Sequence, residues 1–97
     1  MQINITSRGQ ALSEHLQHYV EEKVGKLEKY VQGNGEVHVV LERGTTGQVV
    51  EITFHGLHKT MHAREIGDNM QACVDKAVTK IETQVRKHKD KLTDKRS

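Results

Sequence analysis

Four short segments in which apolar and polar residues alternate predict four β-strands. Ile3 and Ile5 lie on one face of the first segment, and Met61 and Ala63 lie on one face of the last. Because successive side chains of a strand point to opposite faces, this alternation gives each strand one apolar face that can pack on a core. The predicted strands cover residues 2–6, 36–43, 49–54 and 60–66.

Two longer segments have the periodicity of amphipathic helices. The first runs from about Ser13, a residue type suited to N-capping, to about Val31, and Gly33 is expected to end it. The second runs from about Asp68, again a candidate N-cap, to about Leu92. With a turn of about 100° per residue, the apolar positions of the second helix fall in one sector. These positions are Met70, Val74, Ala77, Val78, Ile81, Val85, His88 and Leu92.

The order of these elements, β-α-β-β-β-α, predicts an α+β fold with two helices packed on one face of a four-stranded sheet. A right-handed crossover through the first helix makes the first two strands parallel neighbours. No linker or internal repeat divides the chain. We therefore expect a single domain over residues 1–97, with a frayed tail over about 93–97.

The size and composition exclude several classes of function. A chain of 97 residues has room for a modest core, but none for a buried cofactor pocket beside a substrate domain. The single cysteine, Cys73, lies at the edge of the apolar stripe, so we expect it to be buried, and the lack of an internal disulfide fits a reducing cytosol. No nucleophile stands in a pattern that supplies a base. We expect a cytoplasmic protein that is not an enzyme and has no cofactor, small-molecule substrate or membrane contact.

The charges of the chain are divided between its two ends. Residues 76–97 carry eight Lys/Arg against three Asp/Glu, a net charge of +5, whereas residues 1–75 carry seven against ten, a net charge of −3. Most of the positive segment lies on the second predicted helix, which can present an ordered row of cations. Such a row on an otherwise acidic domain indicates a polyanionic partner.

Each predicted helix also sorts its charges by flank. Lys76, Lys80, Lys87 and Lys91 lie between about 240° and 300° on the wheel of the second helix, and Arg86 lies elsewhere, near 160°. In the first helix, lysines share one flank and Glu14, Glu21 and Glu28 share the other. The ordinary alternative is that these lysines are solvated surface residues without a specific partner. Such a surface would favour mixed signs, because neighbours of opposite charge at i, i+4 stabilise a helix, and sorted flanks forgo some of those pairs. The candidate RNA-binding residues are Lys23, Lys26, Lys29, Lys76, Lys80, Arg86, Lys87, His88, Lys89 and Lys91.

RNA fits this pattern better than duplex DNA. The sequence has no helix-turn-helix pattern, zinc finger or basic zipper, and no aromatic stacking platform of the RRM type on its strands. A row of lysines on a small α+β domain reads shape and phosphate positions rather than base sequence.

Six segments, in the same order and with nearly the same spacing, resemble those of the ribosome hibernation-promoting factors in their short form. These segments are MQINIT at 1–6, YVEEK at 19–23, KLEKY at 26–30, VVL at 39–41, DNM at 68–70 and KHKDK at 87–91. Each motif alone is weak, whereas their ordered sum over nearly the whole chain is strong. The β-α-β-β-β-α fold of that family is similar to the one predicted from periodicity.

The resemblance implies a protein that binds the small ribosomal subunit in the channel for mRNA and tRNA. It implies contact with 16S rRNA through basic residues of both helices, and a block of translation in stationary phase or stress. Long-form relatives add a C-terminal domain that pairs two ribosomes; a short form would promote 100S dimers of the 70S ribosome beside a separate ribosome modulation factor. The lack of a long polar tail favours the promoting over the inhibiting type. The residues that match the basic pattern are Lys23, Lys26, Lys80, Lys87, His88, Lys89 and Lys91.

Two positions depart from the family pattern. Relatives often carry Tyr at the position of Gln71 and Arg at the position of Thr83. The loss of that Arg would weaken phosphate contact at position 83.

Two other functions remain as alternatives. The closely spaced His55, His58 and His62 suggest a small His-rich metal-binding protein, although no cysteine or acidic residue completes a recognised zinc pattern. A general double-stranded RNA-binding protein without ribosome specificity is the second. The double-stranded RNA-binding domain uses lysines at a helix start, whereas here they cluster toward the helix end.

Overall fold

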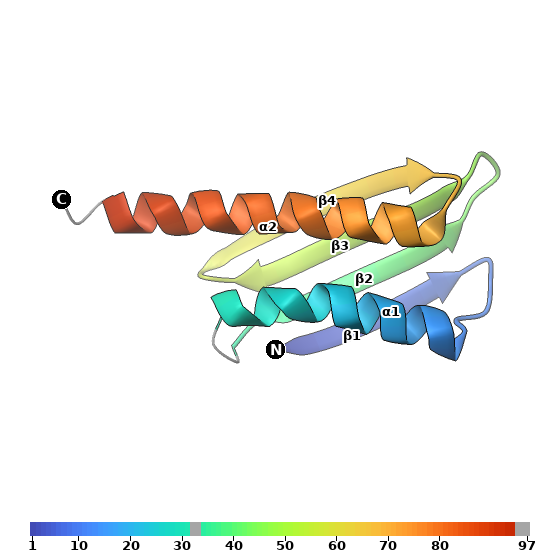
Figure 1. Ribbon diagram of the computed structural model, residues 1–97, viewed down its shortest axis with the longest axis horizontal. Coiled ribbons are helices and arrows are strands. Elements are labelled where there is room, and N and C mark those ends of the chain that lie inside the picture. The colour runs from blue at the N-terminus through green and yellow to red at the C-terminus, as the bar shows by residue number, and fades with distance from the viewer. Residues whose placement is uncertain (32–33, 95–97) are drawn as a thin grey trace.

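The computed structural model describes residues 1–31 and 34–94, and residues 90–94 by their helical backbone only. Its elements follow the predicted order, with a short 3₁₀ helix added after the first helix (Figure 1). The elements are β1 (Gln2–Arg8), α1 (Glu14–Gly25), η1 (Lys26–Tyr30), β2 (Glu36–Arg43), β3 (Gln48–Gly56), β4 (Lys59–Gly67) and α2 (Met70–Asp94).

The four strands form one mixed sheet in the order β1-β2-β3-β4. β1 pairs with β2 in parallel, with Ile5 opposite Val39, and the other two pairings are antiparallel, with Ile52 opposite Ala63. The parallel pairing of the first two strands confirms the prediction from the right-handed crossover. The fourth predicted strand is confirmed as well, since Met61 and Ala63 are both buried.

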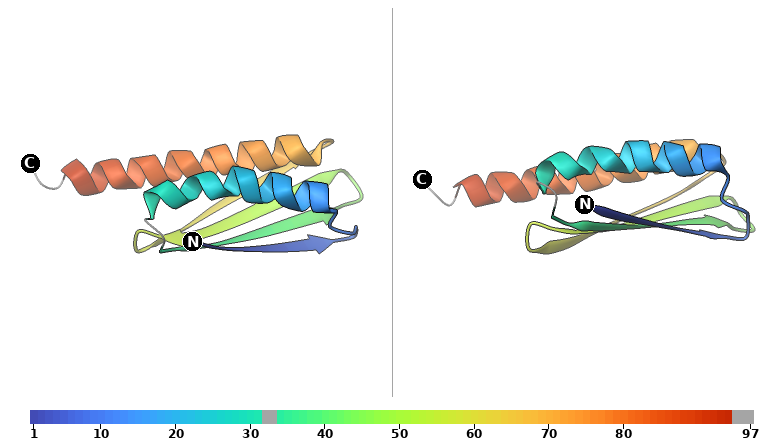
Figure 2. Two further views of the ribbon diagram at one scale, coloured as in Figure 1. Left: turned by 60° about the horizontal axis from the view of Figure 1, so that its bottom comes forward. Right: turned by 90° about the horizontal axis from the view of Figure 1, so that it is seen from below.

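Both helices cover the same face of the sheet and run side by side, and none of the described helices covers the other face (Figure 2). The core lies between these two layers and includes Leu27, Phe54 and Ile81, each fully buried. Cys73 is 3% exposed, which confirms its predicted burial. Its burial raises the pKa of the thiol above the ordinary value. The predicted α+β fold is therefore confirmed.

The first helix changes its geometry in the middle, where a continuous α-helix to about Val31 was expected. The α-helix ends at Gly25, and a 3₁₀ helix continues to Tyr30. Glycine weakens a helix interior, and tightening of a last turn to 3₁₀ geometry is common. In a 3₁₀ helix residues three apart share a side, so Leu27 and Tyr30 both face inward, Leu27 into the core and Tyr30 toward its edge.

The N-caps follow the usual chemistry, with one correction. The backbone N–H of Leu16 donates to the Ser13 hydroxyl at 3.1 Å, as predicted. In α2 the cap is Asn69 rather than Asp68, because the N–H of Ala72 donates to the Asn69 side chain at 3.0 Å. A capping side chain reaches the third residue after it, and Asp68 lies one residue too early. The predicted helix end at Gly33 falls outside the described residues.

A tight two-residue turn joins β3 and β4. Leu57 and His58 both have positive φ angles, 54° and 61°, which is unusual for residues other than glycine. The neighbouring Gly56 is required by space, because a Cβ there would lie 2.7 Å from a methyl group of Val31. The ring of His88 donates from Nε2 to the Leu57 carbonyl at 2.9 Å, so α2 holds this turn directly. Beyond it, the end of α2 projects past the sheet (Figure 1).

Candidate nucleic-acid interface

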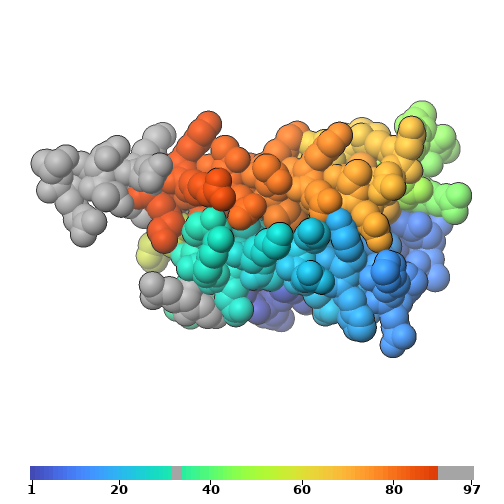
Figure 3. All heavy atoms as spheres, in the orientation of Figure 1, coloured from blue at the N-terminus to red at the C-terminus, as the bar shows by residue number. Residues whose placement is uncertain are grey.

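The first helical segment and α2 meet along a seam whose paired residues keep a constant sequence offset. The His15–Gln71 contact (3.4 Å) and the Tyr19–Asp75 hydrogen bond (2.7 Å) are both formed between residues 56 apart. The hydrogen bond from Arg86 to the Tyr30 hydroxyl, 3.4 Å, has the same offset of 56. The two helices are therefore parallel and in register over their shared length, and they form one continuous surface (Figure 3).

Charged residues of both signs occupy the middle of the seam. The Lys23 ammonium lies 4.0 Å from a carboxylate oxygen of Asp75 and 5.4 Å from the centre of the Tyr19 ring. Lys26 and Glu82 line a small hollow of about 130 Å³ between the helices. On the other flank of the first helix, Glu28 binds the N-terminal ammonium group at 3.1 Å. Lys23 and Glu28 thus lie on opposite flanks, as the sequence predicted.

The Tyr19 hydroxyl is a well-defined link between the helices. It donates its hydrogen bond to the Asp75 carboxylate, and this raises the pKa of Tyr19 above its ordinary value of 10.0. Ionisation would break the hydrogen bond and place a second negative charge beside the first. The first part of the seam is therefore fixed by a neutral phenol and a carboxylate.

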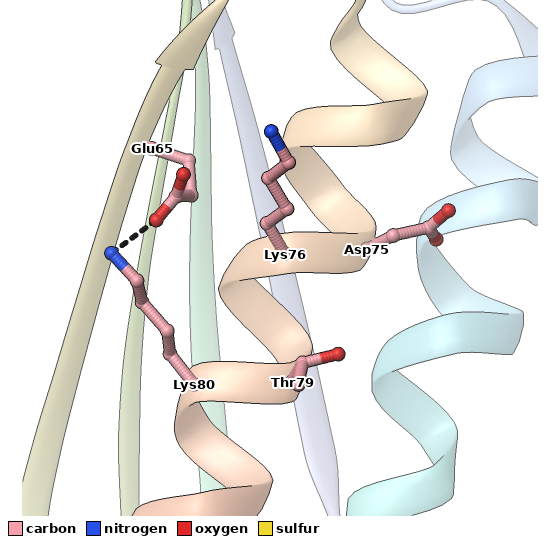
Figure 4. A pocket seen from close by; sticks show the side chains of 5 residues that line it. All are labelled: Glu65, Asp75, Lys76, Thr79 and Lys80. Carbon is pink, nitrogen blue, oxygen red and sulfur yellow. Dashed lines mark ion pairs between the residues drawn. The ribbon is translucent and has the colours of Figure 1, made fainter.

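A second set of cations lies on the opposite flank of α2, above β4, and we call it the outer row. Lys80 forms an ion pair with Glu65 of β4, and Lys76 stands beside it, whereas Asp75 points the other way, toward α1 (Figure 4). These side chains border an open hollow of about 430 Å³. Two residues before the last described side chain of α2, Lys87 borders a second hollow. The members of the outer row are Lys76, Lys80 and Lys87.

The remaining cations converge at the far end of the seam, around Tyr30. The Lys29 and Lys89 ammonium groups lie 5.2 Å and 5.7 Å from the centre of the Tyr30 ring. The guanidinium of Arg86 lies on the same side of α2, 3.8 Å from Glu82, and its hydrogen bond to the Tyr30 oxygen raises the pKa of Arg86. This placement agrees with the helical wheel, which put Arg86 away from the outer row.

The structure thus divides the predicted RNA-binding residues into three places on one helical layer. Lys23 and Lys26 lie in the seam, the outer row lies above β4, and Lys29, Arg86 and Lys89 surround Tyr30. His88 is half-buried on the side of α2 that faces the β3–β4 turn. The side chain of Lys91 is outside the described part. Among the described residues, carboxylates lie within 4.0 Å of Lys23, Lys80 and Arg86.

One cation near this surface is absent from the predicted set. Lys59 begins β4 and borders the same hollow as Lys87 and His88, a space of about 160 Å³. It sits in a turn region of the sequence, where no periodicity relates it to the helices. Strand alternation with the buried Met61 would have placed it on the helix side of the sheet.

The open face of the sheet has a different character. The rings of His38 and His55 meet edge to face with centroids 5.9 Å apart, and Thr53 contacts His62 at 3.2 Å. Among the described residues no group of three His, Cys, Asp or Glu side chains has the geometry to hold a metal ion. His58 lies in the turn between the two strands that carry His55 and His62.

None of the described helices is long and apolar enough to cross a membrane. The model of the family described as Sigma 54 modulation protein / S30EA ribosomal protein matches residues 3–93 of the chain.

Relatives and solved structures agree with this match. The ribosome hibernation promoting factor of Salmonella typhimurium is 35% identical over 92 residues, covering 95% of this chain and 97% of the relative. The protein of the same name from Escherichia coli K12 is 36% identical with the same coverage. The crystal structure of the Thermus thermophilus Protein Y N-terminal domain superimposes with a TM-score of 0.84 at 27% identity, covering 91% of this chain and 99% of that domain.

Proposed function

The chain belongs to the Sigma 54 modulation protein / S30EA ribosomal protein family, and from this membership we propose that it is a ribosome hibernation factor that binds the small ribosomal subunit through its helical layer. The family is one of ribosome-associated hibernation factors and not a known class of enzyme. The site of action is accordingly the cytoplasm, where ribosomes work.

The observation that carries the choice of surface is the uneven distribution of cations between the two faces. The described part of the helical layer exposes seven of the predicted RNA-binding cations against four exposed carboxylates. The cations are Lys26, Lys29, Lys76, Lys80, Arg86, Lys87 and Lys89, and the carboxylates are Glu14, Glu21, Glu22 and Glu28. By strand alternation, the open face of the sheet carries Arg8 and Arg64 against Glu36, Glu42 and Glu51. A polyanion is attracted to the first surface and gains little at the second.

The chemistry of the layer fits ribosomal RNA. Lysines held on two parallel helices present point charges at fixed spacings, which suits phosphate positions in folded RNA rather than base edges. We propose that the contacted RNA is 16S rRNA in the channel for mRNA and tRNA. Occupation of that channel would keep initiation from starting and leave ribosomes idle in stationary phase or stress.

Sedimentation of ribosomes with and without the protein tests this proposal. We expect the protein in the 30S and 70S fractions, and 100S dimers when a separate ribosome modulation factor is also present. Charge reversal of Lys87, Lys89 and Lys91 should remove the protein from these fractions without changing its circular dichroism spectrum. A long non-ribosomal RNA duplex serves as competitor. If it displaced the protein at equal nucleotide concentration, the protein would be a general double-stranded RNA binder instead.

A further inference from the structure

Three polar side chains on one flank of α2 each bind the hairpin that β3 and β4 form. The first contact is an ion pair, and the other two are hydrogen bonds of 2.8 Å and 2.9 Å from a side-chain nitrogen to a backbone carbonyl. Residues four apart share a flank of a helix, so the contacts lie in one line, and we call them the hairpin ties. The tie that His88 forms lies nearest the C-terminal end of α2. The ties join Lys80 to Glu65, Gln84 to His62, and His88 to Leu57.

The His88 tie holds a part of α2 that lies beyond the hydrophobic core. Val85 is fully buried, and it is the last buried side chain in the described part of α2. After it, Arg86, Lys87 and Lys89 are exposed and His88 is half-buried. The helix then projects past the sheet (Figure 1). The direction of this cationic end therefore depends on contacts such as the one between His88 and the β3–β4 turn.

The turn that accepts this hydrogen bond has a strained backbone. Leu57 and His58 have positive φ angles, and residues other than glycine keep that conformation only where the surrounding structure imposes it. The Leu57 side chain packs against the hydrophobic core, and its carbonyl accepts the bond from α2. The turn is thus fixed from two sides, and its carbonyl is a firm anchor for the helix.

The chemistry of the tie does not require a charge on His88. A carbonyl oxygen can only accept a hydrogen bond, so Nε2 must carry the proton, and it does so in the neutral ring as well as in the cationic one. The nitrogen at the tip of the ring is therefore engaged by the turn. In this respect His88 differs from the exposed Lys87 beside it, although both belong to the predicted RNA-binding residues.

We propose that His88 is a positioning residue, which fixes the direction of the projecting end of α2 and does not itself bind RNA. This inference rests on the proposed function, and it gives one of the predicted RNA-binding residues a different role. A helix end that is already fixed loses less freedom on binding, so its cations bind more tightly. Loss of the tie should therefore weaken binding but leave the number of phosphate contacts, and with it the salt dependence, unchanged.

Four variants separate the tie from the charge. His88→Ala removes the donor. His88→Gln keeps a side-chain nitrogen that can donate to the same carbonyl, but it cannot carry a charge. Lys87→Gln removes one exposed charge next to the tie. His55→Ala is the matched control, because it removes a histidine ring from the open face of the same hairpin, where its Nδ1 lies 3.0 Å from the Thr60 hydroxyl.

The affinity of each variant for purified 30S subunits is measured by fluorescence anisotropy over a series of KCl concentrations. We expect His88→Ala to weaken binding about two- to tenfold, the range for loss of one hydrogen bond, with an unchanged slope of log affinity against log salt. His88→Gln should restore most of the affinity. Lys87→Gln should weaken binding and lower the magnitude of the slope by about 0.7–0.9, the value for one phosphate contact. His55→Ala should match the wild type in both quantities.

The results separate this inference from the function on which it rests. If the wild type binds 30S subunits but His88→Ala keeps full affinity, or lowers the magnitude of the slope as Lys87→Gln does, His88 is not a positioning residue and the proposed function stands. If the wild type itself does not bind ribosomal subunits, the proposed function is wrong and the inference falls with it.

Two further measurements keep the test independent of the stability of one variant. Circular dichroism at the assay temperature shows whether His88→Ala is folded; if it is not, His88→Gln decides, because a phosphate contact made by a charged ring would lower its slope and the tie would not. In the free wild-type protein, ¹⁵N spectra of the His88 ring should show a proton on Nε2. A ring that carries its proton on Nδ1 alone would refute the tie.

Discussion

The assignment of RNA binding to the helical layer can be tested by removing the same charge from each face of the protein. Lys76→Gln with Lys87→Gln removes two exposed cations from the outer row. Arg8→Gln with Arg64→Gln removes two from the open face of the sheet. Each double variant lowers the formal net charge from +2 to zero, so the same amount of charge is lost from a different face in each.

The expected difference follows from counterion release. The slope of log affinity against log salt is negative, and each phosphate contact contributes about 0.7–0.9 to its magnitude. The loss of two contacts should therefore lower the magnitude of the slope by about 1.4–1.8. Over a fourfold rise in salt, from about 50 to about 200 mM, the wild type should therefore lose about 7- to 12-fold more affinity than the Lys76/Lys87 variant does. The Arg8/Arg64 variant should keep the wild-type slope. Neither variant should unfold, because exposed ion pairs contribute only about 0–1 kcal/mol.

Anisotropy of the labelled protein with purified 30S subunits, at constant Mg²⁺ and varied KCl, measures these slopes. Thermal unfolding of each variant is the control for the fold. Equal slopes for the two double variants would refute the assignment, because a general loss of positive charge would then explain the data without a particular face. A lower slope for the Arg8/Arg64 variant alone would place the interface on the open face of the sheet.

Three further predictions concern stability and tuning. Leu27→Ala removes a fully buried side chain from the core and should lower the free energy of unfolding by about 2–5 kcal/mol, seen as a drop in Tm of roughly 10–25 °C in calorimetry; an unchanged Tm would mean that η1 does not belong to the core. Glu65→Gln frees Lys80 from its carboxylate and should tighten binding to 30S subunits by up to about fivefold, whereas weaker binding would show that the ion pair serves to present Lys80. Because the folded state raises the pKa of Tyr19, it retains a proton that the unfolded state loses, so the free energy of unfolding should fall as pH rises above about 10. Tyr19→Phe should flatten that fall in urea titrations at several pH values, and an identical pH dependence would count against the Asp75 link.

Local patterns were sufficient for the elements and the layer order. Alternation identified all four strands, because a strand that covers a core on one side must alternate. Helical periodicity identified the buried stripe of α2, and its wheel separated Arg86 from the outer row. Local reasoning was wrong where two neighbouring residues compete for one role, as with Asp68 and Asn69 at the start of α2, and where a helix tightens, as it does after Gly25.

The contacts between the helices lay beyond the reach of sequence periodicity. A wheel gives the direction of each side chain around its own helix, but not how far one helix is shifted along the other. Packing on the twisted sheet sets that shift. It brings Tyr30 to Arg86 and Glu65 to Lys80, although no pattern in the sequence relates the members of either pair.

The amino-acid order alone determined that this protein has a four-stranded sheet, two amphipathic helices and a surplus of cations on those helices, because each of these features depends on residues close together in the chain. The tertiary structure decided that the cations occupy three places around α2 and that each of those places includes a carboxylate. Charge interactions depend on distances through space, and those distances exist only once the helices have been fixed against the sheet and against each other.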